Sequence, residues 1–127
     1  MPLGQSLRVF KAELFKALAH PTRVHILELV RSGERTVSQL QAEIGIDASS
    51  VSQQLALLRA KRIVEGRKEG TSVFYRVVDP NIFTLLDVAR LIFNNHLTDL
   101  QSIAEENDGA PRSTAGTLGR QAPTLAR

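Results

Sequence analysis

Side chains that bear hydroxyl or amide groups gather near the middle of the chain, at Ser49, Ser50, Ser52, Gln53 and Gln54. These uncharged groups both donate and accept hydrogen bonds, so they can address the edges of base pairs in the major groove of DNA. A plain solvated helix face is the alternative, but such a face usually carries Lys and Glu, and residues 48–60 contain neither. We therefore predict that these side chains contact DNA, with no particular base sequence implied.

Two short helices joined by a tight turn, within residues 36–67, are predicted to present these groups. The first helix has apolar residues at spacings i, i+3 and i+7, namely Val37, Leu40 and Ile44. It ends at Gly45, because glycine tolerates the left-handed conformation found after a helix. The second helix buries residues at i, i+4 and i+7, namely Val51, Leu55 and Leu58. Its opposite face then carries the predicted base-contacting groups, as in a helix-turn-helix. Gln54 lies nearer the buried side of this helix, so we expect it to reach phosphate only.

Positive charge is concentrated beside this motif. Residues 59–76 contain six basic and two acidic side chains, a local charge of +4 against +3 for the whole chain. The six basic residues are Arg59, Lys61, Arg62, Arg67, Lys68 and Arg76. Because phosphate contacts supply most of the sequence-independent affinity for DNA, this placement favours a DNA-binding surface.

Periodicity predicts the remaining elements. Residues 6–19 form a helix with a wide apolar face, and a further helix starts at Pro21 and ends near Arg31. Alternating residues then predict a β-hairpin of residues 64–68 and 72–78. Asp79 and Pro80 begin a long helix that runs to about Ala104. The expected fold is mainly α with a small β-hairpin, a winged helix-turn-helix in the order α-α-α-α-β-β-α.

A chain of 127 residues with 43% hydrophobic content supports one domain with a small core. We assign residues 1–106 to a DNA-binding and dimerisation domain, because the long helix is apolar around more of its circumference than one core needs. Residues 107–127 are rich in Gly, Pro, Ser, Thr and Ala and lack apolar periodicity. They are expected to form a disordered tail.

Several classes of protein are excluded by composition. The chain has no cysteine, which excludes disulfides and cysteine-based metal sites. We find neither a signal-peptide pattern nor an apolar run long enough to span a bilayer, so a soluble, cytoplasmic protein is expected. Because the chain has no cysteine nucleophile, no glycine-rich phosphate loop and no recognisable Ser–His–carboxylate set, we predict neither an enzyme nor a cofactor.

Several stretches of the chain together resemble one family of regulators. They are residues 17–23 (ALAHPTR) with Ile26 and Leu27, residues 51–55 (VSQQL), Leu58 with Arg59, and residues 67–70 (RKEG) with Phe74 and Tyr75. In this order they are similar to the opening segment, recognition helix and wing of ArsR-type (arsenic-repressor-like) bacterial regulators. The resemblance covers residues 10–104 without large gaps.

The resemblance implies a homodimer that represses transcription by occupying an imperfect palindrome in double-stranded DNA until a small inducer releases it. Family members pair mainly through their first and last helices, and the surplus apolar surface of these helices points to the same place. The implied interface contains Leu7, Phe10, Leu14, Phe83, Leu86, Leu91, Phe93, Leu97 and Leu100.

The implied DNA contacts combine the recognition helix with the wing. The helix supplies Ser49, Ser50, Ser52, Gln53 and Gln54, with the cation Arg59 beside them, and the wing supplies Arg67, Lys68, Thr71 and Ser72. Arg67 and Lys68 have a plainer alternative as surface charges that protect an edge strand. Their place beside a glycine turn favours contact with phosphate or the minor groove.

This chain departs from relatives that sense metal through a cysteine pair, because Thr36 and Ser38 stand at the matching positions. Another group uses Asp and His ligands on the last helix, but here the spacing of His96 and Asp99 does not fit and a second histidine is missing. No metal site is predicted, and the inducer does not follow from the resemblance. Two alternatives stay open: a winged-helix module that binds another protein through the long helix, and a metal-responsive sensor that uses His96 and Asp99 across the dimer.

Overall fold

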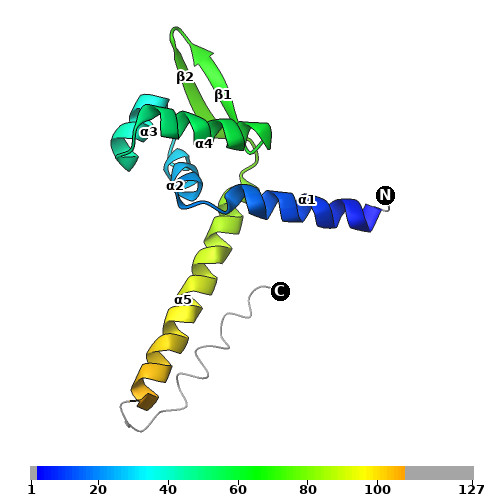
Figure 1. The fold of residues 1–127 in the computed structure, drawn as a ribbon, viewed down its shortest axis with the longest axis vertical. Helices are drawn as coiled ribbons and strands as arrows, with labels where there is room; N and C mark the ends of the chain where they lie inside the picture. Colours follow the sequence, from blue (N-terminus) through cyan, green and yellow to red (C-terminus); the bar gives the residue numbers. More distant parts are fainter. Residues whose placement is uncertain (1–2, 108–127) are drawn as a thin grey trace. The chain divides into compact units, whose positions relative to one another are not determined.

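The computed structural model describes residues 3–107, which contain five helices and one antiparallel hairpin (Figure 1). The elements are α1 (Leu3–Leu18), α2 (Pro21–Val30), α3 (Val37–Ile44), α4 (Ala48–Ala60), β1 (Val64–Glu69), β2 (Ser72–Val77) and α5 (Asn81–Asn107). The predicted winged helix-turn-helix and its element order are confirmed. The tail predicted for residues 107–127 lies outside the described residues except for Asn107, which ends α5.

Two compact units make up the chain, one ending at Phe83 and the other starting at Thr84. The first unit holds α1 to α4, the hairpin and the first turn of α5, and the second holds the rest of α5. Each unit is described by itself. The assignment of residues 1–106 to a single domain remains a prediction.

Side-chain caps set where three of the helices begin. His20 accepts a hydrogen bond at Nδ1 from the Thr22 N–H, with Pro21 as the first helical residue of α2. Thr36 and Gln39 form a capping box at the start of α3, and Gly45 ends that helix at φ +85°, as predicted. Asp47 caps α4. Because each cap satisfies backbone groups that have no partner inside the helix, the short α3 is held at both ends.

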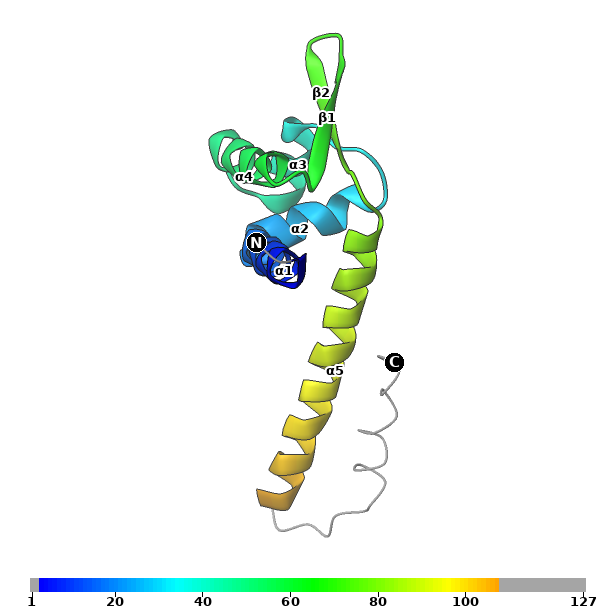
Figure 2. The same cartoon turned by 90° about the vertical axis from the view of Figure 1, so that its right-hand side faces the viewer.

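The core of the first unit lies where α2, α3 and α4 pack against one another (Figure 2). Its fully buried side chains are Ile26, Leu27, Leu40, Val51, Leu55 and Leu58. The three residues that the pattern placed on the buried face of α4 are therefore confirmed. Removing each such side chain from water contributes about 1.5–3 kcal/mol, so this small cluster fixes the two helices of the helix-turn-helix.

The hairpin is joined to the helices at Tyr75. Strands β1 and β2 pair from Val64 opposite Val77 to Glu69 opposite Ser72, and Gly70 in the turn has φ +61°. Arg35, between α2 and α3, exchanges two backbone hydrogen bonds with Tyr75 at 3.2 and 2.8 Å. A Cβ at Gly66 would lie 2.8 Å from Val73 Cγ1, so glycine there lets the strands and the Tyr75 ring pack closely.

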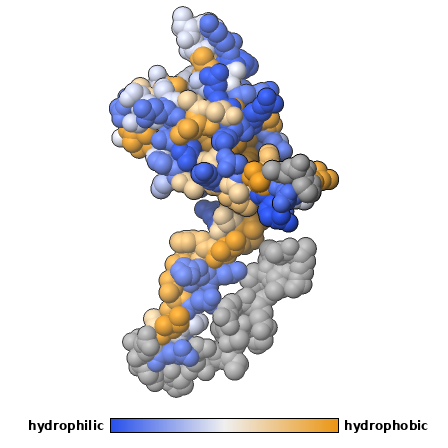
Figure 3. Space-filling view, turned by 45° about the vertical axis from the view of Figure 1, so that its right-hand side comes forward, coloured by the Kyte–Doolittle hydropathy of each residue, from blue (hydrophilic) through white to orange (hydrophobic). Residues whose placement is uncertain are grey.

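The first and last helices carry most of the exposed apolar side chains. No residue of α1 is buried, and α1 extends away from the three packed helices of its unit (Figure 1). In the second unit, apolar side chains follow the length of α5 (Figure 3). The Asp79 carboxylate accepts a hydrogen bond from the Asn81 N–H at 2.9 Å, and α5 begins at Asn81, one residue later than predicted. Within residues 3–107 no helix is long and apolar enough to cross a membrane.

Candidate nucleic-acid interface

The outer face of the N-terminal half of α4 is polar and uncharged. Ser49, Ser52 and Gln53 are exposed, and Ser50 and Gln54 are half-buried. Val51, Leu55 and Leu58 anchor the opposite side in the core, so the helix cannot rotate without losing that burial. The structure thus brings the predicted base-contacting residues together on one element. Their contact with DNA stays a prediction.

Asp47 organises the first turn of this face. Its carboxylate accepts hydrogen bonds from the Ser49 hydroxyl, the Ser50 hydroxyl at 2.7 Å and the Ser50 N–H at 3.1 Å. The bond from the Ser49 hydroxyl, followed by those from Ser50, lowers the pKa of Asp47 from 3.8 to about 2. Asp47 is therefore ionised at neutral pH, and it places a negative charge beside a surface predicted to meet DNA. The sequence analysis did not identify this carboxylate as a partner of both hydroxyls.

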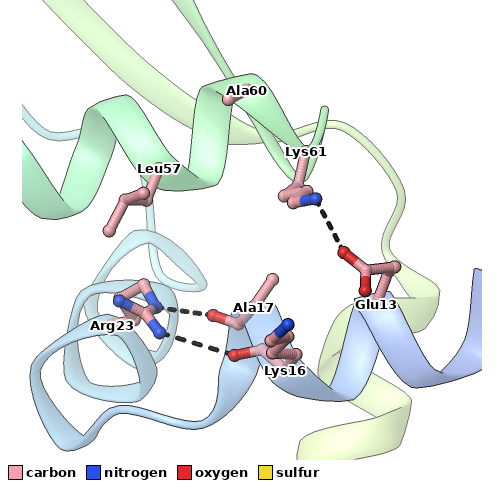
Figure 4. A pocket seen from close by; sticks show the side chains of 7 residues that line it. All are labelled: Glu13, Lys16, Ala17, Arg23, Leu57, Ala60 and Lys61. Carbon is pink, nitrogen blue, oxygen red and sulfur yellow. Dashed lines mark hydrogen bonds and ion pairs between the residues drawn. The ribbon is translucent and has the colours of Figure 1, made fainter.

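Gln54 is held from inside the molecule. Arg23, on α2, donates from Nη1 to Gln54 Oε1 at 2.9 Å. The same guanidinium donates from Nε to the Ala17 carbonyl at 2.6 Å and from Nη2 to the Lys16 carbonyl at 3.4 Å (Figure 4). Arg23 therefore links the end of α1 to α4. This agrees with the prediction that Gln54 lies nearer the buried side, and it leaves Gln53 as the glutamine on the open face.

A cleft of about 280 Å³ lies beside this linkage, between the end of α1 and the second half of α4 (Figure 4). Its lining residues are Glu13, Lys16, Ala17, Arg23, Leu57, Ala60 and Lys61. Lys61 Nζ lies 3.0 Å from Glu13 Oε1, and this hydrogen bond lowers the pKa of Glu13. The ion pair makes a second link, between α1 and the C-cap residue of α4.

Arg67 of the wing forms ion pairs within the chain, and its predicted contact with DNA stays a prediction. The Arg67 guanidinium lies 2.7 Å from Glu34 Oε1 and 2.7 Å from Glu69 Oε2, and it stacks 5.0 Å above the Phe74 ring. These hydrogen bonds raise the pKa of Arg67, and the bond from Arg67 lowers the pKa of Glu34. Arg67 thus fastens β1 to the segment between α2 and α3. Lys68, Thr71 and Ser72 are exposed around the tip of the hairpin.

The six basic side chains of residues 59–76 divide into two sets. Lys61, Arg67 and Arg76 each lie within 3.2 Å of a carboxylate oxygen. In the part of the chain that the structure describes, Arg59, Arg62 and Lys68 have no such partner. The second set is therefore the one whose charge is available to phosphate without breaking an existing ion pair.

The residues predicted for the dimer interface retain apolar surface in the single chain. On α1, Phe10 is 63% exposed and Leu7 is 51% exposed, while Leu14 is half-buried. On α5, Phe93 is 57% exposed; Leu91, Leu97 and Leu100 are also exposed, and Phe83 and Leu86 are half-buried. Exposed apolar surface on this scale is typical of an interaction face. Pairing through these residues stays a prediction.

His96 and Asp99 both lie on α5, at the spacing i, i+3. Among residues 3–107 no group of three or more His, Cys, Asp or Glu side chains is placed to hold a metal ion. Within this described part of the chain, the structure therefore adds no third ligand.

Comparison with known proteins connects this geometry to one family. The family model described as "Bacterial regulatory protein, arsR family" matches residues 20–65, from the cap of α2 into β1. The chain is 39% identical over 104 residues to the uncharacterized HTH-type transcriptional regulator Rv0081 of Mycobacterium tuberculosis. This match covers 81% of this chain and 91% of that protein. It is 37% identical over 82 residues to the biofilm growth-associated repressor of Xylella fastidiosa, covering 65% of this chain and 72% of the repressor.

Solved structures agree with the fold. The crystal structure of Rv0081 matches with a TM-score of 0.69 and 40% identity, covering 76% of this chain and 97% of that one. The solution NMR structure of Mb0332 from Mycobacterium bovis, described as a homodimeric winged helix-turn-helix DNA-binding domain, matches with a TM-score of 0.69 and 30% identity. That match covers 76% of this chain and 90% of the domain.

Proposed function

Because the chain belongs to the ArsR family of bacterial regulatory proteins, we propose that it is a homodimeric repressor that binds an imperfect palindromic operator in its target promoters. Proteins of this family are transcriptional regulators and not enzymes. Two similar proteins support the finer statement: one is described as a repressor and another as a homodimeric DNA-binding domain.

The observation that carries this proposal is the surface of α4. Its exposed Ser49, Ser52 and Gln53 are uncharged, and the buried residues on the opposite side hold them in a fixed orientation. An α-helix with such a face fits the major groove, where a glutamine can pair with adenine through two hydrogen bonds. The proposed base contacts are therefore Ser49, Ser50, Ser52 and Gln53.

Contacts with the DNA backbone are proposed on both sides of α4. Arg59 and Lys68 supply cations without a carboxylate partner among the described residues, and Thr71 and Ser72 supply hydroxyl groups at the wing tip. Gln54 and Arg67, which are engaged by Arg23 and by Glu34, contribute mainly by positioning α4 and the wing. A phosphate contact from either would compete with these existing bonds.

Dimerisation is proposed through the exposed apolar side chains of α1 and α5. These helices leave Leu7, Phe10, Phe93 and Leu97 in contact with water in the single chain, which is unfavourable by about 25 cal/mol for each Å² that a partner could cover. A twofold dimer would place two α4 helices about 34 Å apart, in successive major grooves. Sedimentation of the full chain tests this step: a stable monomer at micromolar concentration contradicts it.

The decisive experiment is selection of DNA by the full-length protein. Random duplexes are enriched by repeated binding, and the enriched sequence is measured by gel shift between 50 and 200 mM salt. We expect an imperfect palindrome with half-sites one helical turn apart. If the dimer neutralises six to ten phosphates, affinity falls by about 10³ to 10⁵ over that range of salt.

A second function has one observation in its favour, the exposed apolar surface of α5. A winged-helix module that binds another protein would use this surface, and its affinity for DNA would be incidental. Absence of a gel shift at low salt, together with no enriched sequence, would favour the interaction module over the repressor.

A further inference from the structure

The hydroxyl groups at the start of α4 are fixed by a single carboxylate. Ser49 Oγ donates to Asp47 Oδ2, and Ser50 Oγ donates to Asp47 Oδ1 at 2.7 Å. The Ser50 N–H also donates to Oδ2, at 3.1 Å, which holds the carboxylate over the first turn of the helix. Two adjacent side chains of the proposed DNA surface thus share one acceptor.

The direction of these bonds follows from the chemistry of the acceptor. An ionised carboxylate has no proton to give, so the proton in each bond comes from the serine. A hydroxyl group has only one proton, and here it points toward Asp47. Each serine oxygen therefore has only lone pairs left for another partner, and it can accept a hydrogen bond but cannot donate one.

The major groove contains few groups that can donate to such an oxygen. They are the N6 amino group of adenine and the N4 amino group of cytosine, whereas guanine N7 and O6, thymine O4 and adenine N7 are all acceptors. We propose that Asp47 is a specificity-determining residue that makes the Ser49 and Ser50 hydroxyls acceptors only, so that they recognise an amino group of adenine or cytosine. This inference rests on the proposed function, because it requires α4 to lie in the major groove.

Ser52 provides a matched control on the same helix. Its hydroxyl is exposed and has no hydrogen bond to Asp47 or to another described residue. It is therefore free to donate as well as to accept, and it can adapt to any base edge. The two kinds of serine differ in one property: Ser49 and Ser50 already donate their hydroxyl proton to Asp47, and Ser52 does not.

The test combines protein variants with base analogues in the selected operator. Purine in place of adenine, or 2-pyrimidinone in place of cytosine, removes one amino group, and 7-deazapurines remove one N7 acceptor. Dissociation constants are measured for the wild type and for Ser49→Ala, Ser50→Ala, Ser52→Ala and Asp47→Asn. A double-mutant cycle between the base and the serine cancels the weaker pairing of the analogue with its complementary base.

We expect removal of one amino group to weaken the wild type by roughly three- to tenfold, the range of a single hydrogen bond. The same removal should have no added effect in Ser49→Ala or Ser50→Ala. Removal of N7 should affect the wild type and these variants equally. In Asp47→Asn the side-chain amide donates to one serine, which releases that hydroxyl proton, so coupling to N7 should appear.

Two results would overturn the inference while the repressor proposal stands. One is a selected operator in which Ser49 and Ser50 couple to N7 or to a carbonyl oxygen of a base. The other is a selected operator to which neither serine couples at all. Failure to select any sequence would overturn both proposals. Because Asp47→Asn also changes a helix cap, its thermal midpoint is measured in parallel, and the serine variants decide the question if it does not fold.

Discussion

Arg23 and Gln54, separated by 31 positions in the sequence, are joined by a hydrogen bond of 2.9 Å between Nη1 and Oε1. The same guanidinium holds the last carbonyl groups of α1 (Figure 4). One side chain therefore fixes α4 relative to α2 and the end of α1. The orientation of α4 therefore depends on this contact as well as on its buried leucines.

The first prediction concerns that linkage. Arg23→Met removes the donor to Gln54 and to the Ala17 carbonyl, so we expect the free energy of unfolding to fall by roughly 1–3 kcal/mol. Gln54→Ala should lower the free energy of unfolding by less, because Arg23 keeps its bonds to the carbonyl groups of α1. Urea unfolding at one fixed protein concentration measures both, and a double mutant gives the coupling between them. Additive effects of the two changes would show that the pair is not energetically linked.

The second prediction separates Gln53 from Gln54. Gln53 is exposed on the open face of α4, so Gln53→Ala should weaken binding to the selected operator more than binding to random DNA. Gln54→Ala should weaken binding to both DNAs to a similar degree, because it removes the bond to Arg23 that positions α4. Parallel gel shifts on the two DNAs give the ratio. Equal losses from Gln53→Ala on both would count against base reading by that residue.

The third prediction uses the ion pairs of the wing. Lys68 has no carboxylate partner among the described residues, so Lys68→Gln should reduce the slope of log affinity against log salt by about one for each chain. Arg67 is paired with Glu34 and Glu69, so Arg67→Gln should reduce the slope less. It should instead lower the thermal midpoint by loosening β1. A larger change of slope from Arg67→Gln than from Lys68→Gln would show that the ion pairs open on DNA.

The fourth prediction is a dependence of stability on pH. Hydrogen bonds from Ser49 and Ser50 lower the pKa of Asp47 from 3.8 to about 2, so the ionised form stabilises the folded state. That contribution is complete above the unfolded pKa and is lost as the pH falls toward the folded pKa. We expect the wild type to be more stable than Asp47→Asn at pH 6 and the difference to shrink toward pH 2. Thermal unfolding at several pH values measures it, and a constant difference would contradict the assignment.

The fifth prediction concerns the end of α4. Arg62 has φ +58°, and the bonds from Arg62 N to Arg59 O and from Ile63 N to Leu58 O, both 2.9 Å, form a Schellman motif. A left-handed conformation costs an ordinary residue about 1–2 kcal/mol, part of which glycine regains. Arg62→Gly should therefore raise the thermal midpoint by a few degrees. Arg59→Gly, inside the helix, is the control and should lower it.

Local patterns in the sequence predicted the elements well, because the interactions that determine the elements join residues close to one another in the sequence. The i, i+4, i+7 spacing identified the buried side of α4, and Gly45 and Asp79 marked helix ends through contacts with residues only a few positions away. The first helix begins three residues earlier than predicted, at Leu3, because helix ends depend on weak local preferences.

The side-chain partnerships of the site could not be predicted in the same way. Arg67 was predicted to contact DNA, and that contact stays a prediction. Its pairing with Glu34, 33 positions away in the sequence, could not be predicted, because no periodicity encodes such a pair. The bond between Arg23 and Gln54 is similarly distant. The contacts of Asp47 with two serines are local, and they could have been anticipated, since an aspartate before a helix with serines at the next positions is a capping pattern.

Tyr75 gives the protein a built-in spectroscopic probe. It is the only tyrosine, and the chain has no tryptophan. The residue is 8% exposed, and its backbone is paired on one side with Gly66 and on the other with Arg35. Intrinsic fluorescence therefore originates at a single place, the root of the wing, and a change in emission during titration would report movement there without any added label.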